Sequence, residues 1–410
     1  MPSTPPAPSA VSETAAVRPW LLVGLSVRAL AEAAARGGHP VCAVDAFADR
    51  DTVAACAGRA LPARLGAGWR LRPAAVLAAA SALQGRFAPA GFAGIVTGGG
   101  CEQRPGLLSA LAAIAPVAGS EAAAIRAVRE ARRWFALLDA IGAPHPPVAF
   151  TPPSSQRSWL LKSASGSGGW HIRHWRPELA RSHDDYFQRR RPGRPASVLF
   201  IANGEQPGVV GWQWQITAGN AAQPWRYGGV LTADDLPAGI KARITDIVER
   251  IVARVPLRGL LGLDFLVDGE AFDVLELNPR PTASLALYPQ HDLFGAHLAA
   301  CAGQPGPALL PEPAPARGEA VLYAPQPLAV AADFPWPAWC ADIPAAGARF
   351  ASGEPVCTVT AAGPNSRALR LRLTARLHRL LTTLNEIPPH EPSLPKRQRT
   401  VGTPGPSPAG

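Results

Sequence analysis

The segment GLLGLDFLVDGEAFDVLELNPRP, residues 259–281, constrains the fold of this 410-residue chain more than any other. Apolar residues alternate with other types on both sides of Asp268-Gly269, a dipeptide typical of tight turns, and this pattern predicts a β-hairpin. Side chains two residues apart on a strand point to the same face. Glu276 and Asn278 are therefore expected on one face, and the leucine that precedes each of them on the other.

Asp264, on the first strand of the hairpin, is expected to converge on the patch formed by Glu276 and Asn278. Carboxylate and amide oxygens suit a hard divalent cation such as Mg²⁺, which usually also binds substrate phosphates. Arg280 follows on the same face, where it would neutralise a phosphoryl group. The alternative is an exposed strand face with salt bridges. The alternation with leucines indicates burial, and buried carboxylates need partners, so the metal site is favoured.

A second stretch, WLLKSASGSGGWHI at residues 159–172, leads from a strand-like segment through Lys162 into a loop of small residues. Lysine is rare here and accounts for three of the 40 basic residues. The loop offers free backbone N–H groups and the ammonium group is a compact charge, so the stretch suits phosphate. It is not a P-loop, because the lysine precedes the glycines. Taken alone, the stretch is also compatible with a flexible surface hairpin.

Residues 19–52 and 91–114 each have the pattern of a strand, a glycine turn and a helix, which predicts an α/β domain. Ligand contacts are expected where the strands end, although the glycines also fit simple tight turns. Glu102 follows the glycine cluster Gly98–Gly100. It is either a substrate contact or a charge near a helix N-terminus that the helix dipole favours.

The remaining sequence divides the chain into five parts. Residues 1–18 are rich in Pro, Ser and Ala and lack the basic and apolar regions of a signal peptide. A Pro-rich linker near 303–318 precedes a segment with β character and an Arg-rich helix near 366–384. The predicted parts are a disordered lead (1–18), an α/β domain (19–118), a central domain (119–305), a C-terminal extension (306–385) and a disordered basic tail (386–410).

Composition limits the classes of partner. The net charge of +10 would suit nucleic acid, but the chain has only 4 Tyr and no aromatic residues interleaved with basic ones, so we expect none. No apolar run reaches the roughly 18 residues of a membrane span, so we expect no membrane contact. Six scattered cysteines without a CxxC pair indicate reduced thiols and a cytoplasmic location.

The lysine loop, followed about a hundred residues later by Asp264 and ELNPRPTAS, resembles the ATP-grasp superfamily. The resemblance covers roughly residues 20–305. It implies an α/β and α+β fold in which a Rossmann-like pre-ATP-grasp domain precedes two α+β subdomains that clasp ATP, here with a C-terminal extension. Residues 119–305 would be the nucleotide-binding and catalytic domain. The stretches GGGCEQRPGLLSAL and NPRPTASLAL look like a branch of predicted ATP-dependent carboligases.

The resemblance also implies roles for residues that match the family's nucleotide motifs. Lys162 would contact the ATP phosphates, and Gln188 would face the adenine. Arg129 stands where a lysine usually opens the nucleotide domain, and Arg189 stands where a carboxylate usually follows the hinge glutamine. Trp170 and the histidine after it replace small residues. The loop covering the phosphates would comprise Gly166, Ser167, Gly168 and Gly169.

The catalytic roles follow in the same way. Arg280, together with Lys162, would face the γ-phosphate or an acyl-phosphate, and Ser197 matches a position near the substrate. Mg²⁺, or Mn²⁺ in its place, would be held by Asp264, Glu276 and Asn278.

The family chemistry implies an ADP-forming ligase that joins a small-molecule carboxylic acid to an amine through an acyl-phosphate. Relatives of the branch point to the assembly of a one-carbon cofactor, and homodimers are common for the fold. The alternatives are an ATP-dependent, carboxylase-like enzyme acting on bicarbonate, and a catalytically inactive nucleotide-binding regulatory protein. The departures at Arg129 and Arg189 agree with the second alternative. A basic tail that binds nucleic acid is a further rival.

Overall fold

The computed structural model describes residues 17–387, apart from residues 64, 67–69, 156 and 307–314. Almost all of the predicted disordered lead and basic tail, and the middle of the Pro-rich linker, lie outside the described residues. Within the described part, no helix is both long and apolar enough to cross a membrane.

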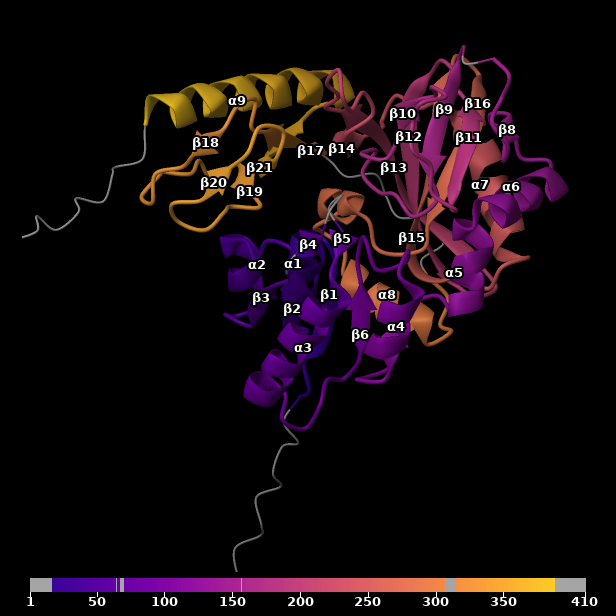
Figure 1. Ribbon diagram of the computed structural model, residues 1–410. Coiled ribbons are helices and arrows are strands. Elements are labelled where there is room, and N and C mark those ends of the chain that lie inside the picture. Colours follow the sequence, from indigo (N-terminus) through magenta and orange to yellow (C-terminus); the bar gives the residue numbers. More distant parts are fainter. Residues whose placement is uncertain (1–16, 64, 67–69, 156, 307–314, 388–410) are drawn as a thin grey trace, which may run out of the picture.

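The N-terminal part is an α/β unit around a five-stranded parallel sheet of order β3-β2-β1-β6-β7, at the bottom of Figure 1. After β1 the chain adds β2 and β3 on one side of it, and later β6 and β7 on the other side. The carboxyl ends of β1 and β6 therefore form a switch point, where such sheets bind ligands. Gly24 and Gly98 follow these strands, and a Cβ on Gly24 would lie only 3.1 Å from the Gly98 Cα. The elements are β1 (Trp20–Val23), α1 (Arg28–Arg36), β2 (Val41–Asp45), α2 (Arg50–Ala55), β3 (Ala60–Pro62), β4 (Leu65–Gly66), β5 (Arg70–Leu71), α3 (Pro73–Phe87), β6 (Ile95–Thr97), α4 (Pro105–Ala112) and β7 (Val117–Ala118).

A small antiparallel sheet of order β10-β9-β11-β8 carries the lysine stretch. Strand β11 of this sheet is followed in the chain by a strand of a different sheet, which begins at Arg194. The chain crosses from one sheet to the other at Gly193, whose φ of +131° favours glycine. The elements of this part are α5 (Ala122–Arg129), α6 (Ala131–Ala140), β8 (Val148–Ala149), β9 (Trp159–Ser163), β10 (Arg173–His174) and β11 (Asp185–Arg189).

An eight-stranded sheet of order β16-β15-β12-β13-β14-β17-β21-β19 spans the rest of the described chain. Its main apolar core lies against helices α6, α7 and α9. The predicted C-terminal extension continues this sheet, because β17 pairs with β14 and α9 packs on β17 and β21 (Figure 1). The elements are β12 (Arg194–Asn203), β13 (Pro207–Thr217), β14 (Tyr227–Thr232), α7 (Ala238–Val252), β15 (Arg258–Asp268), β16 (Ala271–Asn278), η1 (Ala283–Leu287), α8 (Leu293–Cys301), β17 (Ala316–Tyr323), β18 (Leu328–Ala329), β19 (Cys340–Ala341), β20 (Arg349–Phe350), β21 (Pro355–Gly363) and α9 (Ser366–Glu386).

His297, on α8, joins the N-terminal sheet to the large sheet. Its Nδ1 accepts a hydrogen bond from the Leu260 N–H of β15 at 2.9 Å, and its Nε2 lies 3.2 Å from the Ala118 carbonyl of β7. One ring nitrogen accepts and the other donates, so the ring is neutral. The side chain is 1% exposed, and burial lowers the pKa of His297 to about 4.

Acidification is expected to destabilise the fold through His297. Between pH 6.5 and 4 the unfolded chain binds a proton at this residue and the folded chain does not, so the free energy of unfolding falls as the pH falls. The shift corresponds to roughly 3 kcal/mol. Urea unfolding at several pH values should show a shallower pH dependence in His297→Gln than in the wild type. His378→Gln, at an exposed position of α9, is the control and should keep the wild-type slope.

Candidate active site

The predicted hairpin forms one wall of the site. Strands β15 and β16 pair with Asp264 opposite Glu276 and Gly262 opposite Asn278, so the predicted polar patch is assembled. The register skips Leu275, which is the extra residue of a β-bulge. Leu275 lines the cavity beside Glu276, so the expectation that it faces the opposite side is wrong. The bulge interrupts the strict alternation on which that expectation rested.

Asp264 and Glu276 are held in contrasting electrostatic surroundings. Gln215 Nε2 donates to Asp264 Oδ1 at 2.8 Å, and Asn278 Nδ2 donates to Oδ2 at 3.1 Å. Burial and the facing Glu276 carboxylate raise the pKa of Asp264. Burial also acts to raise the pKa of Glu276, but the charges of Arg129 and then Lys162 outweigh it and hold that pKa below its usual range.

These side chains satisfy a simple test for a magnesium site. Two carboxylates face each other with an amide beside them, and a cation between them would relieve their repulsion. Within the described residues, no three His, Cys, Asp or Glu side chains are grouped so as to hold a metal ion. Mg²⁺ commonly takes only one or two protein carboxylates and completes its shell with water and phosphate, so the donor set fits.

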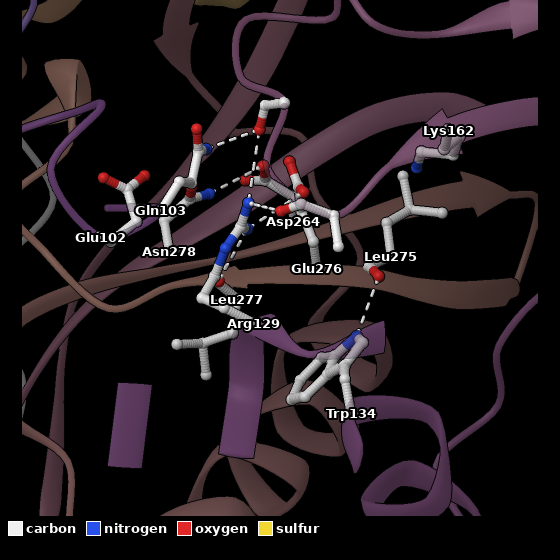
Figure 2. Close-up of polar contacts among 12 residues, drawn as sticks. Glu102, Gln103, Arg129, Trp134, Lys162, Asp264, Leu275, Glu276, Leu277 and Asn278 are labelled. Atoms are coloured by element: carbon white, nitrogen blue, oxygen red, sulfur yellow. Dashed lines mark hydrogen bonds and ion pairs between the residues drawn. The ribbon is translucent and has the colours of Figure 1, made fainter. Parts of the chain in front are cut away.

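Arg129, the last residue of α5, ties this wall to the glycine loop (Figure 2). Its Nη1 donates to Glu276 Oε2 at 3.3 Å and to the Leu277 carbonyl at 3.4 Å. Its Nη2 donates to the carbonyls of Ala164 at 3.0 Å and Gly166 at 3.4 Å. Arg129 does not line the cavity, so it acts from behind the wall.

Lys162 and Gln188 lie on neighbouring strands, β9 and β11, and face the cavity. Both are buried, and Lys162 Nζ donates to Gln188 Oε1 at 3.1 Å. The Gln188 Nε2 is buried and makes no hydrogen bond within the described residues. A buried donor without an acceptor is costly, so Gln188 has a hydrogen bond to offer a ligand.

The loop 166–169 needs its glycines. Gly168 and Gly169 have φ values of +60° and +74°, and a Cβ on Gly169 would lie 1.9 Å from the Trp225 carbonyl oxygen. The Gly168 carbonyl accepts from the Tyr227 N–H at 2.9 Å. The backbone amides of the loop are therefore held close to β14 at the edge of the cavity.

Trp170, where the sequence departs from the family, packs against the C-terminal segment. Its ring lies edge-on to Tyr323 of β17 with centroids 6.1 Å apart, and the Arg226 guanidinium lies 5.5 Å from its centroid. Tyr323 in turn donates to the Tyr227 carbonyl at 2.7 Å. Trp170 thus links the glycine loop to strand β17 of the C-terminal segment.

Arg280 projects from the end of the hairpin toward the N-terminal domain. Its Nε donates to Glu102 Oε1 at 2.9 Å, and its Nη2 donates to Asn278 Oδ1 at 3.2 Å. Glu102 Oε2 accepts from the Gly100 N–H at 2.8 Å. Burial acts to raise the pKa of Glu102, but Arg280 holds it below its usual range. Glu102 lies behind Arg280 and outside the cavity lining, so an effect of Glu102 on a substrate would pass through Arg280.

A single cavity of about 950 Å³ joins these groups and runs between the N-terminal domain, the two sheets and the C-terminal segment. Ser197 also lines it and donates to Gln213 Oε1 at 3.1 Å. Two predicted site residues, Arg129 and Glu102, lie outside its lining. The predicted residues that line it are Lys162, Gly166, Ser167, Gly168, Gly169, Gln188, Ser197, Asp264, Glu276, Asn278 and Arg280.

Sequence reasoning missed two glutamines. Gln215 holds Asp264, and Gln103 Nε2 donates to the Gly166 carbonyl at 2.6 Å. A signal for Gln215 was present in GWQWQIT, because a glutamine that alternates with tryptophans in an apolar strand needs a polar partner.

Comparison with known proteins decides the family. Residues 132–284 match the family model described as an ATP-grasp domain. This part of the chain is an ATP-grasp domain. The ATP-grasp domain therefore contains all the predicted site residues except Glu102 and Arg129. No functionally curated protein matches the chain in sequence.

Solved ATP-grasp structures extend the likeness over most of the chain. N5-carboxyaminoimidazole synthase from Aspergillus clavatus, in complex with ADP and 5-aminoimidazole ribonucleotide, is 14% identical with a TM-score of 0.61, over 90% of this chain and 99% of that one. Biotin carboxylase from Campylobacter jejuni, in a β,γ-ATP complex, is 14% identical with a TM-score of 0.64, over 86% and 89%. The biotin carboxylase domain of Hydrogenobacter thermophilus 2-oxoglutarate carboxylase is 12% identical with a TM-score of 0.66, over 87% and 88%. At these identities the likeness confirms the expected fold.

The Glu102 contacts predict a structural effect. In Glu102→Gln an amide NH₂ replaces one of the two acceptors, so either Arg280 or the Gly100 N–H loses its partner. The free energy of unfolding is expected to fall by about 1–3 kcal/mol, measured by denaturant titration. Glu121→Gln, at an exposed position whose side chain makes no capping bond, should change it by less than about 0.5 kcal/mol. Equal stabilities of the two variants would contradict the role assigned to Glu102.

Proposed function

We propose that this protein is an ADP-forming ligase that uses ATP and Mg²⁺ to join a small carboxylic acid to an amine. One observation carries the proposal: Lys162, Gln188, the carboxylate pair Asp264 and Glu276, and Arg280 face one cavity of an ATP-grasp domain. The solved proteins with this fold include complexes with ADP and ATP, which supports a nucleotide in the same cavity.

The nucleotide would lie between the small and large sheets. The unpaired Gln188 Nε2 supplies a donor for the adenine, and the Lys162 ammonium supplies a charge for the phosphates. The backbone N–H groups of residues 166–169 would cover the phosphates, because successive amides in a glycine loop form a concave anion site. Arg129 keeps that loop in place through the carbonyls of Ala164 and Gly166.

The metal would be held by Asp264, Glu276 and Asn278. Mg²⁺, or Mn²⁺ in its place, neutralises the charge on the ATP phosphates when bound. Gln215 and Arg129 orient the two carboxylates from behind. Arg280 is itself oriented by Glu102 and brings a guanidinium to the end of the same patch.

The reaction would take place in two steps. An oxygen of the acid attacks the γ-phosphorus, and the bond from this phosphorus to the bridging oxygen of ATP breaks. ADP is released and the acid becomes an acyl-phosphate. The amine nitrogen then attacks the acyl carbon, the carbon–oxygen bond to phosphate breaks, and inorganic phosphate and a proton are released. Lys162 and Arg280 would stabilise the negative charge on the transferred group, so the protein contributes positioning and charge neutralisation.

A second candidate is carboxylation with bicarbonate as the acid. It is favoured by the structural relatives, among which N5-carboxyaminoimidazole synthase and biotin carboxylase recur. Incubation with Mg²⁺-ATP and [¹⁴C]bicarbonate separates the two: fixed label that depends on an acceptor would favour the carboxylase. Use of the product in a one-carbon cofactor, membership of the carboligase branch, a homodimeric state and a cytoplasmic location stay predictions.

The Glu276→Ala variant tests the enzyme against an inactive nucleotide-binding protein. ADP release from Mg²⁺-ATP with a pool of carboxylic acids and primary amines is expected to fall about 10²- to 10³-fold, since a proposed ligand of the metal that neutralises the phosphate charge is lost. Far-UV circular dichroism should stay unchanged. Glu270→Ala, at the exposed turn of the same hairpin, is the matched control and should keep full turnover. Tight ATP binding without turnover in the wild type, with any acceptor, would support the regulatory protein instead.

A further inference from the structure

The cavity has a second polar wall, away from the carboxylate pair, whose residues have no role in the proposed reaction. It is built by the β1–α1 and β2–α2 loops of the N-terminal domain and by residues of the C-terminal segment. The two parts are in direct contact, because the Arg50 N–H donates to the Ile343 carbonyl at 2.8 Å and Asp51 accepts from the Asp342 N–H at 2.6 Å. In Figure 1 β19 lies close to α2.

Negative charge is in excess on this wall. Arg28, at the start of α1, is its central cation and is 5% exposed. Its guanidinium contacts Asp342 at 2.9 Å and both Glu32 and Glu319 at 3.1 Å, and it lies 3.9 Å from Asp51. One guanidinium therefore faces four carboxylates, of which Glu319 and Asp342 line the cavity together with Asp49, and the wall can take a further positive charge.

Asp49 is the carboxylate of this wall that has no hydrogen-bond or ion-pair partner among the described residues. It is 7% exposed, lines the cavity, and makes no hydrogen bond or ion pair through its side chain within the described residues. It stands at the N-cap of α2, where aspartate usually caps, yet its side chain does not cap that helix. The neighbouring Asp45, by contrast, accepts from the Phe47 and Ala48 N–H groups. Burial, with the repulsion of Asp342 and Asp45, raises the pKa of Asp49 to about 8.

A buried carboxylate without a partner is costly, and it is neutralised either by a proton or by a cationic ligand. An organic cation fits this position, because apolar side chains line the cavity together with the carboxylates. Apolar residues complete this end of the cavity, and Phe47, Val321 and Phe350 are among them. Such a surface suits the carbon skeleton of the same molecule.

We propose that this wall binds the amino group of the amine substrate in its ammonium form, with Asp49 as its main partner and Asp342 and Glu319 beside it. The ammonium passes one proton to the Asp49 carboxylate, and this frees the nitrogen lone pair for attack on the acyl carbon. The inference rests on the proposed ligase function and adds the place and chemical class of the acceptor. The position opens to the reacting centre, because Asp49 and Arg280 line the same cavity.

Equilibrium binding of benzylamine and benzyl alcohol tests this, because the two probes differ chiefly in charge. Calorimetry on the full-length protein at pH 7 is expected to give benzylamine a Kd at least about tenfold lower than benzyl alcohol. In Asp49→Asn the benzylamine Kd should rise about tenfold while that of benzyl alcohol stays the same. Asp268→Asn, which removes an exposed carboxylate outside the cavity, should change neither.

The failure of this inference is distinguishable from that of the ligase function. Equal affinities for the two probes, or a benzylamine Kd unchanged in Asp49→Asn, would overturn the ammonium site even if Mg²⁺-ATP binds and ADP forms. Absence of Mg²⁺-ATP binding would overturn the ligase function alone, because the amine is measured without nucleotide. Asp49→Asn is expected to fold, since it removes a carboxylate that its neighbours repel, and the wild-type comparison of the two probes stands without it.

Discussion

The guanidinium of Arg129 is the contact on which the geometry of the site depends. It joins a helix end, the second strand of the carboxylate hairpin and the glycine loop through one carboxylate and three carbonyl contacts. A lysine carries three donors on one atom and could not span these groups. The planar fork of arginine can, and it does so from outside the cavity. The arginine therefore fixes the positions of Glu276 and Gly166 without occupying space that a nucleotide would need.

The polar groups of the cavity form two sets with different electrostatic demands. At the hairpin, Lys162 and Arg280 meet the carboxylates of Glu276 and Asp264 in a balance that suits metal and phosphate. At the opposite wall, Arg28 is outnumbered by carboxylates, and Asp49 has no counterion. Bound substrates that place anionic groups at the hairpin and a cation at the opposite wall match both sets of polar groups.

Local patterns in the sequence could predict the parts of the site that lie within one hairpin or one loop. Alternation placed Glu276 and Asn278 on one face, and the turn at Asp268-Gly269 fixed the register as far as the pair Phe265 and Val274. Asp264 lies opposite Glu276 only because the bulge at Leu275 shifts that register by one residue. The bulge at Leu275 was not predictable, since it depends on packing. Contacts between distant segments were also out of reach: Arg280 and Glu102 are 178 residues apart. Their meeting depends on the order of strands in two sheets, which periodicity does not encode.

The pairing of β14 with β17 has a consequence for how the molecule folds. Arg28 lies in the N-terminal domain, and its partner Glu319 follows 291 residues later. An N-terminal domain that forms early during synthesis would hold this guanidinium with Glu32 and Asp51 but without Glu319 and Asp342, and the loss of two of its four partners weakens the unit that contains it. The first domain should thus reach its full rigidity only when the last strands join the large sheet. Completion of the chain and completion of the cavity would then be a single cooperative event.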